Sequence, residues 1–317
     1  MLPQAVLMMA YGSPGSLDDV EAYLRQVRGG RPTPPAMVEK TRARYAAVGG
    51  KSPLLDITLA QAGAVDARLR DLAPDHAFRV FVGMRHWFPY IHEAVQQIRQ
   101  AGLRQIVALC LTPYYSKLST QAYFDQLDRA VAAEARATGQ AAPEVAYVNA
   151  WHRQPSFIQA LAGKLKGALD QFPAADGPSG KIIFTAHSLP VVAGQEDDPY
   201  PEQVGQTARA VAERVGLAPG QWELCYQSAG AMAGDWLGPS LDATLDKLAQ
   251  AGTREVLLAP IGFVSDHIET LYDLDIGAAG HAAQRGLAFR RLEALNTDVT
   301  FVQALAQIIL EEVVREK

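Results

Sequence analysis

The residues best suited to metal chemistry gather in one acidic segment of the second half of the chain, GFVSDHIETLYDLD. Asp266, Glu269 and Asp273 are spaced i, i+3 and i+7, which places them on one face of an α-helix. His267 lies close to them in the sequence. Carboxylates next to an imidazole form an oxygen and nitrogen ligand set that suits a divalent transition-metal ion in transit. A solvated acidic face is the usual alternative for such a run, but apolar residues are interleaved with the acids here.

A second candidate for chemistry is His187, which follows the apolar run Ile182–Thr185 in the segment FTAHSLP. A histidine with an ordinary pKa is mostly neutral at pH 7, so it can accept a proton or bind a metal ion. A single histidine after a strand is more often structural, and its position alone does not decide between these roles. Ser188 beside it suggests a hydrolase, but the chain lacks a G-x-S-x-G elbow and adjacent residues do not form a Ser–His pair.

Basic and hydroxyl residues in the first half of the chain suit a ligand that carries carboxylates. Arg44 lies in TRARY and is followed by the stretch GGKSP, which contains Ser52. The diglycine lets the backbone approach a ligand closely. Arg44 offers a guanidinium fork for a carboxylate, and Ser52 offers a hydroxyl. Arg28 in VRGGR and Arg85 in GMRHW are further candidates, although a surface arginine taken alone is more often ordinary.

Short apolar runs alternate with amphipathic helical patterns along the chain. The runs that indicate strands are Ala5–Met9, Phe78–Val82, Ile106–Leu111, Val145–Val148, Ile182–Thr185, Leu224–Gln227 and Glu255–Ala259. The helical patterns are Leu17–Val27, Ile91–Gln100, Thr120–Ala137, Phe157–Phe172, Gln203–Val215 and Leu241–Ala249. Strands that alternate with helices predict a doubly wound α/β fold with parallel sheets. Ligands of such sheets bind beyond the carboxyl ends of the strands, where His187 and Arg85 are expected.

The chain also contains two versions of one unit. AGLRQIV at 101–107 matches AGTREVL at 251–257, and each segment leads through a strand to a proline, Pro113 or Pro260. Together with the length of 317 residues, this favours two similar domains of the doubly wound α/β type. We expect an N-terminal domain of residues 1–150 and a C-terminal domain of residues 151–317.

Composition and charge narrow the class of protein. A net charge of -5 argues against a nucleic-acid surface, and no stretch reaches the ~18 apolar residues of a membrane span. The first residues lack a basic region and resemble a buried strand, so a cytoplasmic protein is expected. Cys110 and Cys225 both lie in apolar runs, which predicts buried thiols in a reducing compartment. Two cysteines cannot supply the four that an iron–sulfur cluster normally takes.

Over nearly its whole length the chain resembles the ferrochelatase family. The segments that match, in the family's order, are MAYGSP, RYAAVGGKSPL, FTAHSLP, DPYPEQV, WLGPSLD and GFVSDHIETLYDLD. The resemblance implies two Rossmann-like domains with a porphyrin cleft between them, with the first domain on the porphyrin-binding side. It also implies a lyase that inserts ferrous iron into a porphyrin during haem biosynthesis.

The resemblance assigns roles in this reaction to three residues of the second domain. It implies that His187 is the catalytic and iron-contacting histidine, and that Glu269 is the carboxylate opposed to it. Asp273 then continues an acidic row along which the metal arrives. The chain departs from the family one turn later, because Gly277 stands where another carboxylate often appears.

Within the family, the resemblance favours the type that acts on coproporphyrin III. The segment before the diglycine, GGRPTPPAMVEKTRARY, is short and polar rather than an apolar lip, and Tyr11 is present in the first loop. The resemblance implies that Tyr11 contacts the iron of the product. It implies that the porphyrin carboxylates are contacted by Arg28, Arg44, Tyr45, Ser52 and Tyr123. A monomer with porphyrin and ferrous iron as substrates, and with no tightly bound cofactor, is expected.

Three other interpretations stay open on the sequence. A ferrochelatase for protoporphyrin IX differs only in its substrate. A cobalt chelatase relies on a second metal-binding histidine, for which His267 is the obvious candidate near Glu269. A non-catalytic porphyrin or haem carrier would need ring contacts, but neither a base such as His187 nor an acidic entry row.

Overall fold

The computed structural model describes residues 3–172, 180–192, 197–230 and 234–315 of the chain. It divides into two compact units, of which the first comprises Met1–Trp151 and Thr297–Lys317 and the second His152–Asn296. The expected second domain of residues 151–317 differs from this division, because the chain returns to the first unit for its last helix. Each unit has its own parallel sheet, as the alternation of strands and helices predicted.

Most residues of the first unit's sheet are buried. Its strands are β1 (Gln4–Ala10), β2 (Phe78–Met84), β3 (Gln105–Cys110) and β4 (Glu144–Val148), and they are parallel in the order β2-β1-β3-β4. Residues Ala5 to Ala10 of β1 are all buried. Near-continuous apolar runs of this kind are typical of parallel strands that helices cover on both faces.

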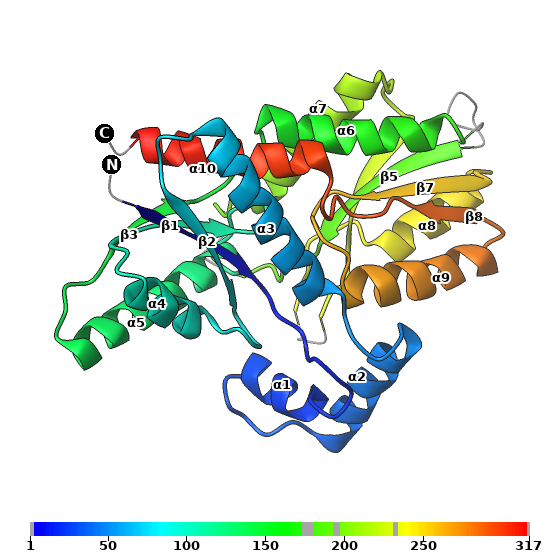
Figure 1. Ribbon diagram of the computed structural model, residues 1–317. Coiled ribbons are helices and arrows are strands. Elements are labelled where there is room, and N and C mark those ends of the chain that lie inside the picture. Colours follow the sequence, from blue (N-terminus) through cyan, green and yellow to red (C-terminus); the bar gives the residue numbers. More distant parts are fainter. Residues whose placement is uncertain (1–2, 173–179, 193–196, 231–233, 316–317) are drawn as a thin grey trace. The chain divides into compact units, whose positions relative to one another are not determined.

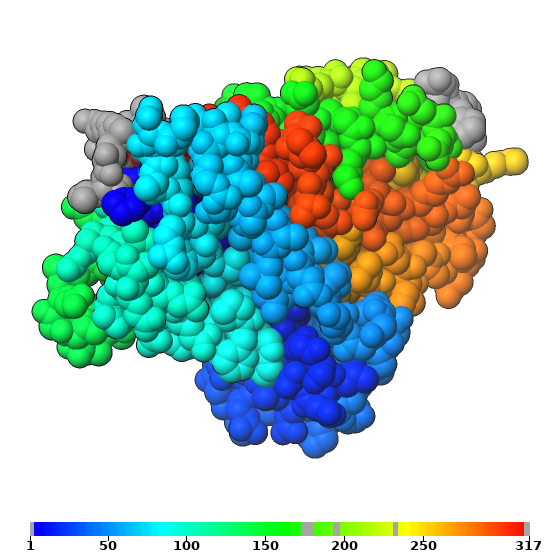
Figure 2. All heavy atoms as spheres, viewed as in Figure 1, coloured from blue at the N-terminus to red at the C-terminus, as the bar shows by residue number. Residues whose placement is uncertain are grey.

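Helices cover both faces of this first sheet (Figure 1). α4 (Ile91–Gln100) and α5 (Thr120–Thr138) share a core with β1, β2 and β3 on one face. α3 (Leu54–Leu72) and α10 (Val299–Arg315) pack together on the other. α1 (Val20–Val27) and α2 (Pro35–Ala47), blue in Figures 1 and 2, form a lobe of the same unit beyond the sheet.

The last helix, α10, belongs to the first unit through buried contacts. Phe301 is fully buried, and its ring centroid lies 6.0 Å from that of Trp151. The Arg68 side chain of α3 donates a hydrogen bond to Gln303 of α10. These contacts join residues more than a hundred positions apart, which is why sequence periodicity did not reveal them.

The second unit repeats the strand order of the first. Its strands are β5 (Gly180–His187), β6 (Trp222–Gln227), β7 (Glu255–Pro260) and β8 (Ala288–Arg291), parallel in the order β6-β5-β7-β8. In each unit the first strand in sequence is flanked by the second and third, and the fourth lies at an edge. The prediction of two similar α/β units is confirmed.

Helices also cover both faces of the second sheet (Figure 1). One face carries α8 (Leu241–Gln250), the π-helix η2 (Glu269–Ala278) and α9 (Ala279–Gln284), around a core that includes Ile183 and Cys225. The other carries α6 (Pro155–Leu169) and α7 (Tyr200–Val215).

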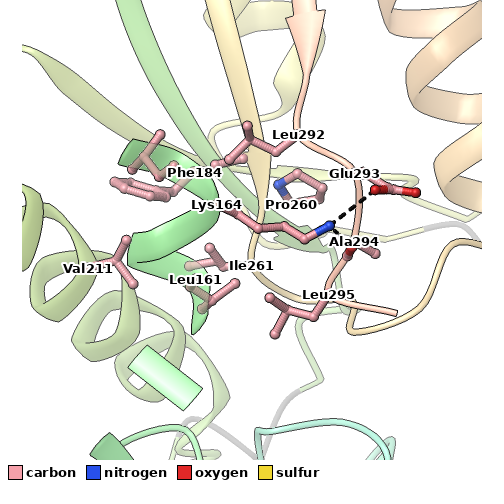
Figure 3. Close-up of a pocket in the computed structure, with 12 residues that line it drawn as sticks. Leu161, Lys164, Phe184, Val211, Pro260, Ile261, Leu292, Glu293, Ala294 and Leu295 are labelled. Atoms are coloured by element: carbon pink, nitrogen blue, oxygen red, sulfur yellow. Dashed lines mark hydrogen bonds and ion pairs between the residues drawn. The ribbon is translucent and has the colours of Figure 1, made fainter. Parts of the chain in front are cut away.

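Figure 3 shows a small apolar pocket on the α6 and α7 side of this sheet, lined by Phe184, Val211 and Leu161 among others. Lys164 closes its edge by donating hydrogen bonds to the Ala294 carbonyl oxygen, at 2.7 Å, and to Glu293, at 3.2 Å. The lining is almost wholly apolar and the lysine is already paired, so we interpret the pocket as a packing gap. No helix among the described residues is both long enough and apolar enough to cross a membrane.

The packing of α10 yields a first prediction. Phe301→Ala should lower the free energy of unfolding by about 3–5 kcal/mol, because it leaves a cavity against Trp151. Denaturant unfolding followed by tryptophan fluorescence measures this loss. Val299→Ala on the same helix, where the side chain is 84% exposed, should change the stability by no more than about 0.5 kcal/mol. Equal losses in the two variants would contradict this account of α10.

Candidate active site

The backbone of His187 is fixed at the carboxyl end of β5. His187 pairs in register with Gln227 of β6, and the next backbone N–H, of Ser188, donates to the Gln227 carbonyl oxygen at 2.7 Å. Tyr200 at the start of α7 donates its hydroxyl to the His187 carbonyl oxygen at 2.8 Å. On the other side, a Cβ atom added at Gly262 would lie 2.8 Å from the Cα of Ala186, so only glycine fits there.

The ring of His187 is oriented as well. Its Nδ1 faces the carbonyl oxygen of Ser188. Because a carbonyl oxygen can only accept, Nδ1 carries a proton and donates it to this oxygen. The other nitrogen, Nε2, lies 3.7 Å from Oε1 of Glu269. The side chains of both residues remain about a third exposed, at 30% and 33%, so the pair is accessible from outside.

Glu269 is held between two imidazoles. Its second oxygen, Oε2, lies 3.5 Å from Nε2 of His267, whose Nδ1 lies 3.1 Å from the Ser265 carbonyl oxygen. The ring of Phe263 packs edge-on against His267, with centroids 4.3 Å apart, and also lies near His187 at 6.3 Å. The apolar ring limits the water that could screen the three polar groups.

This arrangement shifts the pKa of both partners in the His187–Glu269 pair. Burial alone would lower the pKa of His187, but the adjacent Glu269 carboxylate outweighs it and the pKa is raised. Burial likewise opposes ionisation of Glu269, yet the two imidazoles hold the pKa of this carboxyl well below its usual range. At neutral pH the site therefore presents a carboxylate anion beside a histidine that has a strengthened affinity for a proton.

The predicted acidic helix is a π-helix, and one of its three acids points elsewhere. η2 begins at Glu269, and its i→i+5 hydrogen bonds widen each turn beyond the 3.6 residues of an α-helix. Asp266 precedes this helix and is buried in an ion pair with Arg291, at 2.8 Å. The expectation that Asp266 shares a face with Glu269 and Asp273 is therefore wrong, because Arg291 draws this carboxylate away.

Asp273 lies one π-helical turn beyond Glu269. Its Oδ2 accepts a hydrogen bond from the Ser228 hydroxyl at 2.7 Å. Asp273, Gly277, Ser228 and Gln227 are among the residues that line a cavity between the ends of the strands and η2. Within the described parts of the chain, no three His, Cys, Asp or Glu side chains are gathered as a cage for a metal ion. Glu269 and Asp273 thus follow one another along η2, with His187 of β5 against Glu269, rather than all three surrounding one point.

The first unit places an aromatic and basic group at its own strand ends. Tyr11 follows β1 and is 41% exposed, and its ring centroid lies 4.6 Å from that of His86. Burial and the neighbouring Arg85 lower the pKa of His86 to about 4, so this imidazole is neutral at pH 7. The Arg85 guanidinium lies over the ring of Tyr123, 5.2 Å from its centroid. His86 is not among the residues expected at the site. Its place directly after the end of β2 is the sequence feature that could have indicated it.

The remaining residues expected at the porphyrin lie on or beside the α1–α2 lobe and the start of α3. Gly49 and Gly50 have φ values of 95° and 90°, in the left-handed region that favours glycine. Ser52 is buried, and its hydroxyl accepts a hydrogen bond from the Leu54 N–H at 3.3 Å. Tyr45 is also buried, at 2% exposure, whereas Arg28 follows α1 with its Nη1 3.9 Å from the Met37 sulfur. Arg44 lies in the last turn of α2.

Comparisons with known proteins agree with this fold. Two solved structures of SirB from Bacillus subtilis match this fold. The sirohydrochlorin chelatase SirB in complex with cobalt matches with a TM-score of 0.51, and SirB with Fe3+ matches with a TM-score of 0.54. Each is 10% identical and covers 99% of this chain and 97% of its own. At that identity the likeness establishes the fold alone, a two-sheet α/β architecture.

Sequence comparison defines the family. The ferrochelatase family model matches residues 3–313. A ferrochelatase of Deinococcus radiodurans is 39% identical over 97% of this chain and 95% of its own length. A coproporphyrin III ferrochelatase of Geobacillus thermodenitrificans is 35% identical over 98% and 96%. The chain belongs to the ferrochelatase family, and it is a metal chelatase of the lyase class in haem biosynthesis.

The geometry around Glu269 yields a second prediction. Glu269→Gln should lower the pKa of His187, because removal of the carboxylate charge leaves burial, which favours the neutral imidazole. An NMR pH titration of the His187 ring measures the shift. Asp273→Asn is the matched control and should shift the pKa less, since Asp273 contributes the weakest of the interactions that raise it. An unchanged His187 pKa in Glu269→Gln would show that the two side chains are not coupled in solution.

Proposed function

We propose that this enzyme inserts ferrous iron into coproporphyrin III to give coproheme, the Fe-coproporphyrin III complex. The observation that carries the proposal is the ionised Glu269 held against His187 at the carboxyl end of β5. Metal insertion needs a base for the pyrrole protons and a ligand that releases the ion easily. A histidine and a carboxylate side by side supply both.

His187 acts as the base and as an iron contact. In the reaction two pyrrole N–H bonds break and iron–nitrogen bonds form, so that two protons leave as one Fe2+ enters. Nε2 of His187 accepts these protons one after the other and passes each to solvent, while Nδ1–H stays bonded to the Ser188 carbonyl oxygen. The negative charge of Glu269 stabilises the imidazolium that forms at each transfer.

Glu269 and Asp273 hold the iron on its way to the ring. Glu269 binds the ion opposite the pyrrole nitrogens until these replace it, and Asp273 binds it earlier. The bond from Ser228 to Asp273 keeps this carboxylate directed to the cavity beside η2. Gly277 contributes no charge at the outer end of this row, so we infer that capture of the ion depends on Asp273 more strongly here than in relatives with a carboxylate at that position.

The choice of coproporphyrin III rests on the residues of the first unit. Coproporphyrin III carries four propionates, whereas protoporphyrin IX carries two propionates and two vinyl groups. The carboxylates are contacted by Arg28, Arg44, Tyr45, Ser52 and Tyr123, and Tyr11 contacts the iron of the product. Several relatives at 33–35% identity are named coproporphyrin III ferrochelatases, which supports this choice, although the relative at 39% is named only a ferrochelatase.

The proposal includes a cytoplasmic monomer in which iron is a substrate and no cofactor or iron–sulfur cluster is resident. The state of the cysteines supports the part of the proposal that concerns the iron–sulfur cluster. Cys110 and Cys225 are both free and buried, and burial raises the pKa of each thiol to about 12. Both therefore stay protonated at neutral pH, and a protonated thiol is a poor metal ligand.

The proposed path of the ion predicts different effects for the two acids. Glu269→Gln should reduce the rate of insertion strongly at every iron concentration, because it removes the ligand at the ring. Asp273→Asn should mainly raise the KM for ferrous iron and should recover more of its rate at saturating iron. Anaerobic assays that follow loss of the free-porphyrin spectrum measure both. If the Glu269 variant recovers more of its insertion rate at saturating iron than the Asp273 variant does, the proposed order of the two acids along the iron path is wrong.

Substrate choice is tested with coproporphyrin III and protoporphyrin IX side by side. Hydrogen bonds to charged groups contribute roughly 1.5–3 kcal/mol each, so one additional satisfied propionate should give about tenfold higher kcat/KM for coproporphyrin III. Solvent screening makes this difference in kcat/KM smaller where the propionate and its protein partner are exposed. Arg44→Ala should reduce the ratio of kcat/KM for coproporphyrin III to kcat/KM for protoporphyrin IX. The matched control is Arg70→Ala, an exposed arginine of α3 that pairs with Asp66. Equal or better use of protoporphyrin IX by the unmodified enzyme would refute the substrate assignment alone.

A further inference from the structure

An ion cluster of the second unit centres on Arg291 of the edge strand β8 and joins the buried Asp266 to Asp275, whose side chain is 39% exposed. Arg291 of β8 keeps only 8% of its side chain exposed. Its guanidinium binds Asp275 with two contacts, Nε to Oδ1 at 2.6 Å and Nη2 to Oδ2 at 2.8 Å. The remaining arm, Nη1, donates to Oδ1 of Asp266 at 2.8 Å. One side chain thus joins two carboxylates that lie nine residues apart in the chain.

These two carboxylates bracket the segment that carries Glu269. Asp266 lies three residues before Glu269, ahead of the π-helix, and Asp275 lies six residues after it, inside the helix. Arg291 therefore fixes both sides of the segment to the edge of the sheet. Glu269, near the middle of the bracketed segment, has contacts with His187 and His267 that hold only if the segment keeps its position.

Asn296 completes the attachment of Asp266. Its Nδ2 donates to Asp266 Oδ2 at 2.9 Å, and its Oδ1 accepts from the Asp266 backbone N–H at 2.9 Å. Asn296 adopts a φ of 49°, in the left-handed region that asparagine tolerates better than most residues. The hydroxyl of Thr270, next to Glu269, also lies 3.2 Å from Asp266 Oδ1. The cluster therefore reaches to the residue adjacent to Glu269.

The chemistry of the cluster favours a fixed geometry. A planar guanidinium binds a carboxylate in a fork with defined directions, and such charge-assisted contacts are short and strong. Burial by itself would lower the pKa of Arg291, but the two acids outweigh it and the pKa is raised. π-helical turns are rare and frequently found at functional sites, and the π-helix that begins at Glu269 is bound from outside by Arg291 through Asp275.

We propose that Arg291 is a positioning residue for iron insertion, which holds the Glu269 carboxylate opposite His187 by tying Asp266 and Asp275 to β8. This inference rests on the role proposed above for Glu269. It makes the orientation of the iron-holding carboxylate depend on a side chain of an edge strand that touches neither the ion nor the porphyrin. Outer contacts that orient metal-binding side chains are typically worth 10–100-fold in affinity or activity.

The first test compares Arg291→Met with Arg290→Met. Arg290 is the neighbouring residue of β8, points to the opposite face of the sheet and donates to the Gln171 carbonyl oxygen at 2.8 Å. Arg291→Met should lower kcat for iron insertion about 10- to 100-fold while porphyrin binding, followed by fluorescence quenching, stays unchanged. Arg291→Lys keeps the positive charge but loses the guanidinium fork, so its kcat should lie between that of Arg291→Met and that of the unmodified enzyme. Arg290→Met should insert iron at the unmodified rate.

The second test separates positioning from a general loss of structure. If Arg291 acts through Glu269, then Arg291→Met in the Glu269→Gln background should cost less than about twofold further in kcat, because the carboxylate that it positions is already gone. Asp275→Asn breaks only one limb of the cluster and keeps the Asp266 pair, so it should give an intermediate loss. It serves as the test variant if Arg291→Met does not fold.

Two results would overturn the inference: unmodified kcat in folded Arg291→Met or Asp275→Asn, or a full multiplicative loss in the Glu269→Gln background. The role of Glu269 fails separately. If Glu269→Gln alone inserts iron as fast as the unmodified enzyme, the proposed function of Glu269 is wrong, and this is seen without any change at Arg291.

Discussion

The constraint on which the candidate site depends is an ionised carboxylate that is partly withdrawn from water, since the Glu269 side chain keeps only a third of its surface exposed. Partial removal of this charge from water is unfavourable unless opposite charge or hydrogen-bond donors compensate it. Here two imidazoles supply the compensation, at 3.7 Å and 3.5 Å, and the pKa of Glu269 is held well below its usual range. The same contact raises the pKa of His187. His187 and Glu269 thus supply a base and a metal ligand side by side, and each side chain shifts the pKa of the other.

Such a pair needs a rigid frame, because its energy falls quickly with distance. The frame is the carboxyl edge of the second sheet. β5 ends at His187 between two parallel neighbours, and Gly262 lets the turn after β7 approach β5 more closely than any side chain would permit. Opposite it, the π-helix presents Glu269 from a segment whose flanking acids are bound by Arg291. The two halves of the pair are therefore held by elements of different kinds, a central strand and an edge-anchored helix.

Much of this was accessible from the sequence, and each failure has its own physical cause. Every expected strand is present, and the short repeat AG-x-R correctly indicated two similar units. β8 was missed because the segment AFRR is short and half exposed, without the apolar run that marks a buried strand. The spacing of Asp266 suits the acidic face only if the helix includes this residue, whereas η2 begins at Glu269 and Asp266 pairs with Arg291. α10 was given to the second domain because its partners in α3 and β4 are remote in sequence.

The repeated topology explains why chemistry concentrates at two particular strand ends. In each sheet the chain runs from the first strand to a neighbour on one side and then crosses to the other side, so the first strand lies at the point where the winding reverses. Open α/β sheets bind ligands at such points, because the connections leave on opposite faces and open a crevice there. Tyr11 follows β1 and His187 ends β5, which are the equivalent strands of the two sheets. The same architectural position thus carries a phenol in one unit and an imidazole in the other, and only the second is paired with an acid from a π-helix. What distinguishes the units chemically is therefore the helix that follows the third strand, and η2 has no π-helical counterpart among the described residues of the first unit.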